Sequence, residues 1–405
     1  MERVSVNTHS RYLLEDITRR LKEERMFLQV IAGPRQVGKT TMCRQIAAQW
    51  KGLVRYHTAD SALRPDGEWI DGAWDALRKQ MEFQQADEAV LIIDEVQKVE
   101  NWSEAVKKNW DYDTMSNINI KTVILGSSRL LIKRGLSESL LGRFELNVMG
   151  HWSYHEMKSV FGFTPEQYAY FGAYPGAAKL IENEKRFKDY ISASIIESVV
   201  SKDILQLTQV NKPALLRQAA DVAIAYSSQI VSYNKLLGDF SNAGNSTTLS
   251  HYVQMLDEAG IVSGLQKYTT KAIVTKQSSP KFQVHNPALF TALTPASFTK
   301  AQSDRALWGR FVETAVGAHL FAEKSRLGGA KIRYWRESEG RNTYEVDFVF
   351  EYNGKTLGIE VKSGATQVKS FAKFKERFPN ATTLIVGDDG IPWQEFIAGK
   401  IEHLL

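Results

Sequence analysis

The sequence lacks the features of secreted and membrane-embedded proteins. Its 405 residues contain one cysteine, Cys43, so there is no disulfide framework, which is typical of a reducing compartment. No segment approaches the roughly 20 consecutive apolar residues that a membrane-spanning helix requires. The first residues, 1–20, are polar and charged, without the apolar segment of a signal peptide. These absences predict a cytoplasmic protein with no membrane partner.

The sequence also has little excess of charge of either sign. It carries 51 Lys and Arg against 46 Asp and Glu, which gives a net charge of +5 with His neutral. This balance permits contact with nucleic acid without requiring it. With 43% hydrophobic and 24% charged residues, the composition is ordinary for a globular protein. The length is sufficient for about two to four domains.

The most informative motif is the octapeptide at residues 33–40, which fits the pattern GxxxxGK[ST]. It follows an apolar, strand-like run at residues 27–32, as a phosphate-binding loop does. In such a loop, backbone N–H groups surround the phosphates, Lys39 reaches the β and γ oxygens, and Thr40 ligates Mg²⁺. The motif therefore predicts ATP and Mg²⁺ as cofactors, and its alternative is an ordinary glycine-containing turn. The predicted nucleotide-binding residues are Gly33, Pro34, Arg35, Gln36, Val37, Gly38, Lys39, Thr40 and Thr41.

A second motif is the apolar run 89–93, which ends in the carboxylates Asp94 and Glu95. Such a run is typical of a parallel strand buried on both faces, and open α/β sheets bind ligands at the carboxyl ends of their strands. We expect Asp94 to hold Mg²⁺ through water and Glu95 to polarise the water that attacks the γ-phosphate. Acidic residues also end strands by meeting solvent, so this assignment depends on the upstream loop.

The first region, residues 1–150, alternates predicted helices and strands, which is typical of a P-loop fold. Ser127 follows a predicted strand at the position where a γ-phosphate would be sensed, although serines after a glycine are often turn residues. Arg143 could act as an arginine finger on the ATP of a neighbouring subunit, or could be an exposed helix-end residue. The predicted elements are helices at 11–24 and 39–50 and strands at 27–32, 53–57, 89–94 and 121–125.

Residues 151–210 have a mostly helical pattern, interrupted by a turn signal at 172–176. From Ile191 to Leu205, apolar residues recur at helical spacing. We expect this region to form a helical lid beside the nucleotide-binding core. Core packing alone also explains the apolar positions.

Residues 211–275 have the pattern of a winged helix-turn-helix. We expect Ser232 and Ser246 to cap two helices, the second of which ends at Gly260. Wing strands are expected at 261–268 and 271–274. Because the polar face of the second helix is not strongly basic, both DNA and another protein are candidate partners. The polar residues of that face are Asn245, Thr247, Thr248, His251 and Gln254.

The last region, residues 300–405, contains a second group of charged residues. Glu313 lies on a predicted helix (308–322), and Asp347 lies on a predicted strand (344–350). Glu360 and Lys362 share one side of the next strand, 357–362, after a turn at Asn353–Gly354. Converging carboxylates suit Mg²⁺, with Asp347 and Glu360 as its ligands and Lys362 as a charge-stabilising group. The alternative is an ordinary ion pair between Glu360 and Lys362.

Together these segments resemble the prokaryotic AAA-type P-loop ATPases whose C-terminal domain of unknown function has a restriction-endonuclease-like, PD-(D/E)xK-type fold. The resemblance implies an α/β chain with an AAA-type core (1–150), a helical lid (151–210), a winged helix (211–275) and a nuclease-like domain (300–405). The matching segments are 33–40, 93–99, 126–128, 141–143, 173–175, 312–313, 345–348 and 360–364. The catalytic residues that it implies are Glu95 for ATP hydrolysis and Glu313, Asp347, Glu360 and Lys362 for the nuclease-like site.

Two functions fit this combination of motifs. In the first, an ATPase couples ATP hydrolysis to DNA engagement, and the C-terminal domain cuts DNA with Mg²⁺. In the second, ATP switches a regulatory or scaffold protein, acting alone or as a homo-oligomer, whose nuclease-like domain is catalytically silent and binds DNA or protein. A small-molecule kinase fits the loop motif, but the long C-terminal half argues against it.

Overall fold

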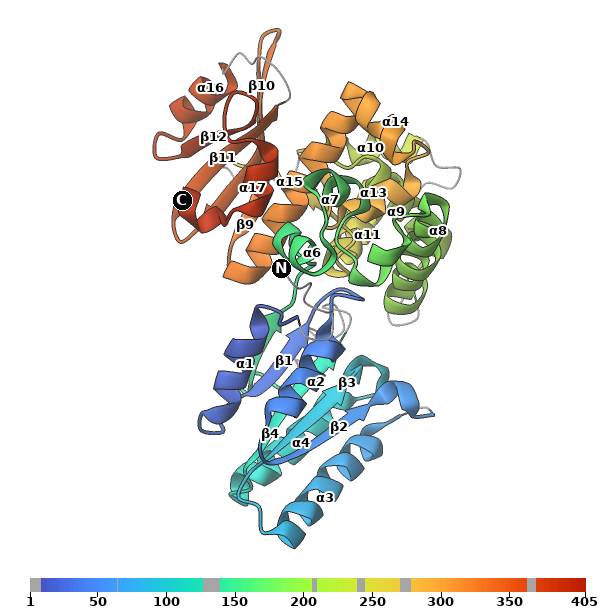
Figure 1. Ribbon diagram of the computed structural model, residues 1–405, viewed down its shortest axis with the longest axis vertical. Coiled ribbons are helices and arrows are strands. Elements are labelled where there is room, and N and C mark those ends of the chain that lie inside the picture. The colour runs from blue at the N-terminus through green and yellow to red at the C-terminus, as the bar shows by residue number, and fades with distance from the viewer. Residues whose placement is uncertain are drawn as a thin grey trace. The chain divides into compact units, whose positions relative to one another are not determined.

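The computed structural model describes residues 9–63, 65–126, 139–205, 210–238, 245–269, 278–362 and 369–405. The chain divides into two compact units, Ser5–Met149 and Gly150–Leu405, which are drawn in Figure 1 and are described separately here. Among the described residues, no helix is both long and apolar enough to cross a membrane.

A five-stranded sheet forms the centre of the Ser5–Met149 unit. Its strand order is β2-β3-β4-β1-β5, and every pairing is parallel. The four strands expected in this unit are confirmed to within one residue, whereas β5, α3 and α4 were not predicted. The strands are β1 Leu28–Ala32, β2 Leu53–Thr58, β3 Ala89–Asp94, β4 Ile120–Gly126 and β5 Phe144–Val148. The helices are α1 Leu13–Lys22, α2 Lys39–Gln49, α3 Gly67–Gln84 and α4 Trp102–Met115.

Helices cover both faces of this sheet because successive side chains of a strand point to opposite sides. On β3, Leu91 and Ile93 belong to a core shared with α3 and α4. Val90 and Ile92 belong to a second core shared with α1 and α2. All four side chains are fully buried. Burial on both faces explains why this strand reads as a continuous apolar run in the sequence.

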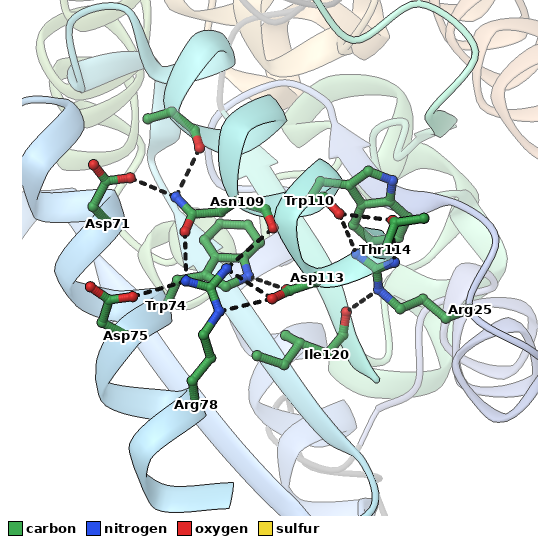
Figure 2. Close-up of polar contacts among 11 residues, drawn as sticks. Arg25, Asp71, Trp74, Asp75, Arg78, Asn109, Trp110, Asp113, Thr114 and Ile120 are labelled. Carbon is green, nitrogen blue, oxygen red and sulfur yellow. Dashed lines mark hydrogen bonds and ion pairs between the residues drawn. The ribbon is translucent and has the colours of Figure 1, made fainter. Parts of the chain in front are cut away.

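Helices α3 and α4 are joined by a buried ion pair between Arg78 and Asp113 (Figure 2). The Arg78 Nε donates to Asp113 Oδ1 at 2.8 Å, and the indole N–H of Trp74 donates to Asp113 Oδ2 at 2.8 Å. Asn109, one turn earlier on α4, accepts from Arg78 and donates to Asp71 on α3. Both Asp113 oxygens therefore have partners, as a fully buried carboxylate requires.

Arg25, which lies between α1 and β1, ties the end of α4 to the start of β4 (Figure 2). Its guanidinium carbon lies 3.5 Å from the centre of the Trp110 ring. The same group donates to the carbonyl oxygens of Ile120 at 2.9 Å and Trp110 at 3.0 Å, and to the Thr114 hydroxyl at 2.8 Å. Helix α4 is therefore connected to α3 through the Arg78–Asp113 pair and to β4 through Arg25.

We expect Asp113→Ala to lower the free energy of unfolding of the Ser5–Met149 unit by about 3–5 kcal/mol. The reason is that Arg78 and the Trp74 indole would be left without their buried acceptor. Urea unfolding followed by tryptophan fluorescence measures the change. Asp75→Ala is the matched control, because this more exposed carboxylate also pairs with Arg78 and should cost less than about 1 kcal/mol. Equal losses in the two variants would contradict a structural role specific to Asp113.

The Gly150–Leu405 unit begins with helical segments. In the range 191–205, which was expected to be helical, residues 191–196 and 199–205 form wide turns of π-helical type. Aromatic side chains of α7 pack against residues further along the chain, as in the pair Tyr170–Phe311, and Phe171 of α7 contacts Phe187 of α8. The segments up to residue 205 are α6 Tyr154–Phe161, α7 Pro165–Phe171, η3 Pro175–Leu180, α8 Glu184–Tyr190, η4 Ile191–Ile196 and η5 Val199–Leu205.

A small three-stranded antiparallel sheet of order β6-β8-β7 follows. Its segments are α9 Pro213–Ala225, β6 Gln229–Ile230, α10 Tyr233–Gly238, α11 Ser246–Glu258, β7 Val262–Leu265 and β8 Lys281–Val284. Ser232 caps α10 as expected, accepting from the Lys235 N–H at 3.2 Å. The cap of α11 is Asn245 and not Ser246, because Asn245 Oδ1 accepts from the Thr248 N–H at 2.8 Å. The strand expected at 271–274 lies outside the described residues, and β7 pairs with β8.

The C-terminal part is built on a four-stranded sheet of order β12-β11-β10-β9. The strand pairs β9/β10 and β10/β11 are antiparallel, and β11/β12 is parallel. Asn353 and Gly354 both have positive φ, of 48° and 76°, as the expected tight turn requires. The predicted helix and strands are confirmed, but they are longer than expected. The segments are α13 Pro287–Leu293, α14 Phe298–Ser303, α15 Arg305–Leu327, β9 Lys331–Glu339, β10 Asn342–Tyr352, β11 Lys355–Lys362, α16 Lys369–Arg377, β12 Thr382–Gly387, α17 Trp393–Ala398 and η6 Ile401–Leu404.

Candidate functional site

The expected phosphate-binding loop connects β1 to α2, and its two glycines are required by the backbone path. Gly38 has a φ of 97°, in the left-handed region that residues with a side chain rarely adopt. A Cβ atom on Gly33 would lie 2.2 Å from the carbonyl oxygen of Met149. The loop ends at the first turn of α2, where backbone N–H groups and the helix dipole favour an anion.

Lys39 lies against the beginning of this loop. Its ammonium donates to the carbonyl oxygens of Gly33 at 2.9 Å and Pro34 at 2.7 Å, and its side chain is buried. On the other side of the loop, the Arg11 guanidinium donates to the carbonyl oxygen of Val37. The loop is therefore held in a defined shape, with a cation at the place where phosphate oxygens would be bound.

Thr40 and Asp94 bring the loop and the end of β3 together. The Thr40 hydroxyl lies 3.0 Å from Asp94 Oδ2, and the Tyr56 hydroxyl donates to the same oxygen. The Glu95 N–H donates to Asp94 Oδ1 at 2.9 Å. A hydroxyl beside a carboxylate is an all-oxygen donor set, which is the set that Mg²⁺ prefers. These residues fit Mg²⁺, and Thr40 and Asp94 are the ones that would hold it.

Glu95 is held in an unusual conformation directly after β3. Its φ is 54°, in the left-handed region, and strained backbone of this kind is common at functional sites. Its carboxylate accepts from the Gln97 side-chain amide at 2.6 Å. Burial raises the pKa of Glu95 above its ordinary value, although the Lys39 charge opposes the rise. An oriented carboxylate with a raised pKa is suited to act as a general base.

Of two further nucleotide-site predictions, the structure does not describe one and places the other away from the loop. Ser127 lies outside the described residues. Arg143 precedes β5, and its carbonyl oxygen accepts from the N–H of Leu28, at the opposite end of β1 from the loop. Its guanidinium makes two hydrogen bonds to Asp111, at 2.8 and 3.1 Å. The finger role of Arg143 therefore stays a prediction about a second subunit.

Two contributors to this site, Tyr56 and Arg11, were missed by the sequence analysis. Tyr56 lies on β2, which is parallel to β3, so its hydroxyl reaches the end of the neighbouring strand. Arg11 lies just before α1, 26 positions before its partner Val37. Neither residue belongs to a local motif that could have revealed its role.

The structure also gathers the charged residues predicted in the C-terminal region. Glu313 of α15 and Asp347 of β10 contact the same ammonium, at 2.6 and 2.8 Å. Glu360 and Lys362 of β11 form an ion pair at 2.8 Å. Burial and the nearby Asp347 both raise the pKa of Glu313 and of Glu360. The four residues thus share one highly charged environment, in which Asp347 and Glu360 are buried, Glu313 is half-buried and Lys362 is exposed.

The ammonium in this cluster belongs to Lys281 of β8, a residue that the sequence analysis did not identify. The Lys281 side chain is 1% exposed. Glu345, a further missed residue, lies 3.7 Å from the same nitrogen. A lysine that starts a four-residue strand ordinarily suggests contact with solvent, so no local pattern marked this position.

The arrangement does not fit the Mg²⁺ site expected at Asp347 and Glu360. Asp347 Oδ1 accepts from Lys281, and Asp347 Oδ2 accepts from the Val361 N–H at 2.8 Å. Glu360 Oε1 is paired with Lys362. Within the residues described, no group of three or more His, Cys, Asp or Glu side chains could hold a metal ion. Three of the four expected ligand oxygens are therefore paired with protein cations or a backbone donor, whereas Glu360 Oε2 is buried without a hydrogen-bond partner in the part of the chain that the structure describes.

Curated relatives of similar length exist in both bacteria and archaea. The uncharacterized protein Rv2008c of Mycobacterium tuberculosis is 24% identical over 339 residues, which are 83% of this chain and 70% of the relative. The uncharacterized protein MJ1544 of Methanocaldococcus jannaschii is 23% identical over 416 residues, covering 93% of this chain and 86% of the relative. Their names assign no activity.

Solved structures with partial similarity include a Walker-type ATPase and a protein bound to AMPPCP. The Walker-type ATPase PABY2304 of Pyrococcus abyssi has a TM-score of 0.47 at 14% identity, covering 72% of this chain and 98% of its own. AMPPCP-bound DnaA from Aquifex aeolicus has a TM-score of 0.32 at 15% identity, covering 64% of this chain and 92% of its own.

Three family models match successive parts of the chain. Residues 163–300 match a domain of unknown function, DUF8612, and residues 308–398 match another, DUF4143. Residues 26–158 match a model described as an AAA domain, and this range contains the loop, Asp94 and Glu95. Residues 26–158 therefore form a P-loop ATPase-like domain of the AAA type.

Proposed function

We propose that this protein hydrolyses ATP at the loop of residues 33–40 and that its nucleotide state controls the engagement of DNA by the segment from α9 to β8. The contact between Thr40 and Asp94, at 3.0 Å, carries the first part of this proposal. It joins the two predicted Mg²⁺ ligands at the end of the loop that also carries the buried Lys39, which supports binding of a nucleoside triphosphate.

In this mechanism each residue has a separate task. The loop N–H groups and Lys39 bind the phosphate oxygens, and Tyr56 holds the Asp94 carboxylate in place. Mg²⁺, when bound, neutralises the charge that develops on the phosphates. Glu95 orients the attacking water and accepts its proton on a carboxylate oxygen. Gln97 keeps that carboxylate oriented through its amide hydrogen bond.

The DNA part of the proposal is supported by the order of elements from α9 to β8 and by the surface of α11. Helix, strand, helix, helix, strand and strand follow one another here, which supports a winged helix-turn-helix, in which the helix equivalent to α11 enters the major groove. A hollow of about 520 Å³ lies along α11 and is lined by hydroxyl, amide, phenol and imidazole side chains. Among them, Ser250, His251 and Gln254 are exposed. Such side chains can contact base edges and phosphates.

We expect the double variant His251→Glu/Gln254→Glu to weaken binding of duplex DNA at least about tenfold, because two negative charges would face the phosphates. ATP hydrolysis without DNA should not change. Fluorescence anisotropy with a labelled duplex, at 50 and 200 mM salt, measures the effect. The matched control Ala214→Glu/Gln218→Glu adds the same charge to exposed positions of α9 and should leave DNA affinity within about twofold of the parent.

Two outcomes would contradict DNA engagement. One is the absence of DNA binding by the parent protein at low salt, with and without ATP. The other is binding that does not weaken as salt rises, because phosphate contacts necessarily release counterions. Either result, together with normal ATPase activity, would favour a protein partner for α11. The ATPase assignment is tested separately through Lys39 and Glu95.

A further inference from the structure

The carboxylate cluster of the C-terminal region is organised around one buried lysine. The ammonium of Lys281 lies 2.6 Å from Glu313 Oε1, 2.8 Å from Asp347 Oδ1 and 3.7 Å from Glu345 Oε1. The contact with Asp347 is a charge-assisted hydrogen bond, and the contact with Glu313 is an ion pair. An ammonium has three donors and no acceptor. This group therefore supplies the positive charge that a bound metal ion would otherwise supply to the carboxylates.

Lys281 cannot leave this position without a change in its own sheet. Its backbone is paired with Ile230 of β6 on one side and with Leu265 of β7 on the other. The next residue, Phe282, is fully buried. The Cα atom of Lys281 is therefore fixed in the central strand of the three-stranded sheet, and its side chain projects into the carboxylate cluster.

The helix that carries Glu313 is fixed to the same strand. The Gln283 side-chain amide donates to the carbonyl oxygen of Thr314 at 3.0 Å. Gly317, one turn further along α15, has no side chain at the point of closest approach. A Cβ atom there would lie 2.3 Å from Gln283 Cδ. Strand β8 thus carries Lys281 and also fixes, through Gln283, the helix that carries Glu313.

A divalent cation at Asp347 would compete directly with this arrangement. Mg²⁺ requires oxygen ligands at about 2.0–2.1 Å in near-octahedral geometry, and both Asp347 oxygens already accept hydrogen bonds from protein groups. A metal ion and the Lys281 ammonium, both positive, cannot share one carboxylate oxygen in a buried site. Displaced from Asp347, the buried ammonium would lose its hydrogen-bonded carboxylate and keep only its ion pairs with Glu313 and Glu345, which is unfavourable.

We propose that Lys281 is the resident cation of this cluster, that it joins the three-stranded sheet to the C-terminal sheet, and that its docking excludes a divalent metal ion from Asp347 and Glu360. The inference does not depend on ATP hydrolysis or on DNA binding. The C-terminal site is then a charge-compensated joint between two sheets, and it does not cut DNA while β8 is in place.

Binding of Mn²⁺, followed by the electron paramagnetic resonance signal of the free ion, tests this proposal. All proteins carry Thr40→Ala and are free of nucleotide, so that the loop site contributes no metal. We expect no Asp347-dependent Mn²⁺ site in this reference protein. Lys281→Met should bind one Mn²⁺ per chain at least about tenfold more tightly, because methionine keeps much of the apolar stem and removes the charge. Adding Asp347→Asn should abolish the new site.

Lys331→Met is the matched control, because it removes an exposed lysine from β9 and should leave Mn²⁺ binding unchanged. If Lys281→Met does not fold, Lys281→Met/Glu313→Gln removes one cation and one carboxylate together, and the same gain is expected. The proposal is overturned if the reference protein binds Mn²⁺ through Asp347, or if the folded Lys281 variants gain no site.

Discussion

Lys39→Ala is expected to weaken binding of Mg²⁺-ATP at least about 100-fold, equivalent to about 2.7 kcal/mol, and to reduce ATP hydrolysis below detection. The variant removes the buried ammonium that lies against the phosphate loop, and a charged donor to a phosphate is among the strongest hydrogen-bonding groups. Titration with a fluorescent ATP analogue measures the affinity. Lys51→Ala, which changes an exposed lysine just after α2, is the matched control and should bind ATP like the parent.

The Lys39 experiment is informative only for a folded protein, because Lys39 also donates to the carbonyl oxygens of Gly33 and Pro34. Circular dichroism and the unfolding midpoint of the variant are therefore compared with those of the parent. A folded Lys39→Ala protein that binds ATP within about threefold of the parent would refute the loop as the nucleotide site. We expect instead that stability falls slightly while nucleotide binding is lost.

Glu95→Gln is expected to reduce the rate of ATP hydrolysis by about 10²–10⁴-fold, the usual contribution of a general base, while ATP affinity stays within about threefold. The amide keeps the shape of the side chain and its hydrogen bond with Gln97, but it cannot accept a proton from the attacking water. Single-turnover hydrolysis separates the chemical step from binding. Glu100→Gln, an exposed glutamate beyond the same strand, is the matched control.

The pH dependence gives a second reading of Glu95. Burial raises the pKa of this carboxyl, and only its ionised form acts as a base, so hydrolysis by the parent should fall on the acid side at a pH above the ordinary glutamate pKa of about 4.3. The residual activity of Glu95→Gln should lack this fall. If Glu95→Gln hydrolysed ATP at the rate of the parent protein, another group would have to activate the water.

The strands and the nucleotide loop were predictable because their signals are local. The run 89–94 is apolar because β3 is buried on both faces, and the loop pattern requires glycine where φ is positive or where Met149 approaches closely. Helix α3 also had a local signal that was overlooked. Its buried residues recur at helical spacing, and Asp66 caps its first turn. These residues are Ile70, Ala73, Trp74, Leu77 and Met81.

The partners of the buried charges were not predictable in the same way. Lys281 contacts Asp347 across 66 positions and Tyr56 contacts Asp94 across 38, and each pair joins different segments of the chain. The expected metal site at Asp347 and Glu360 relied on the convergence of carboxylates, which the structure contains. That prediction did not include the Lys281 ammonium, which neutralises these carboxylates.

The sequence by itself determined the local backbone and the residue types at the nucleotide loop, because glycine conformation, apolar burial and strand alternation depend on neighbouring residues. Only the tertiary structure decided which charged side chains are paired with one another in the interior. Electrostatic pairing in a site of low dielectric depends on distance in space and on the exclusion of water, and both are set by the packing of β8, α15, β10 and β11. The same carboxylates would suit a metal ion if Lys281 did not project among them.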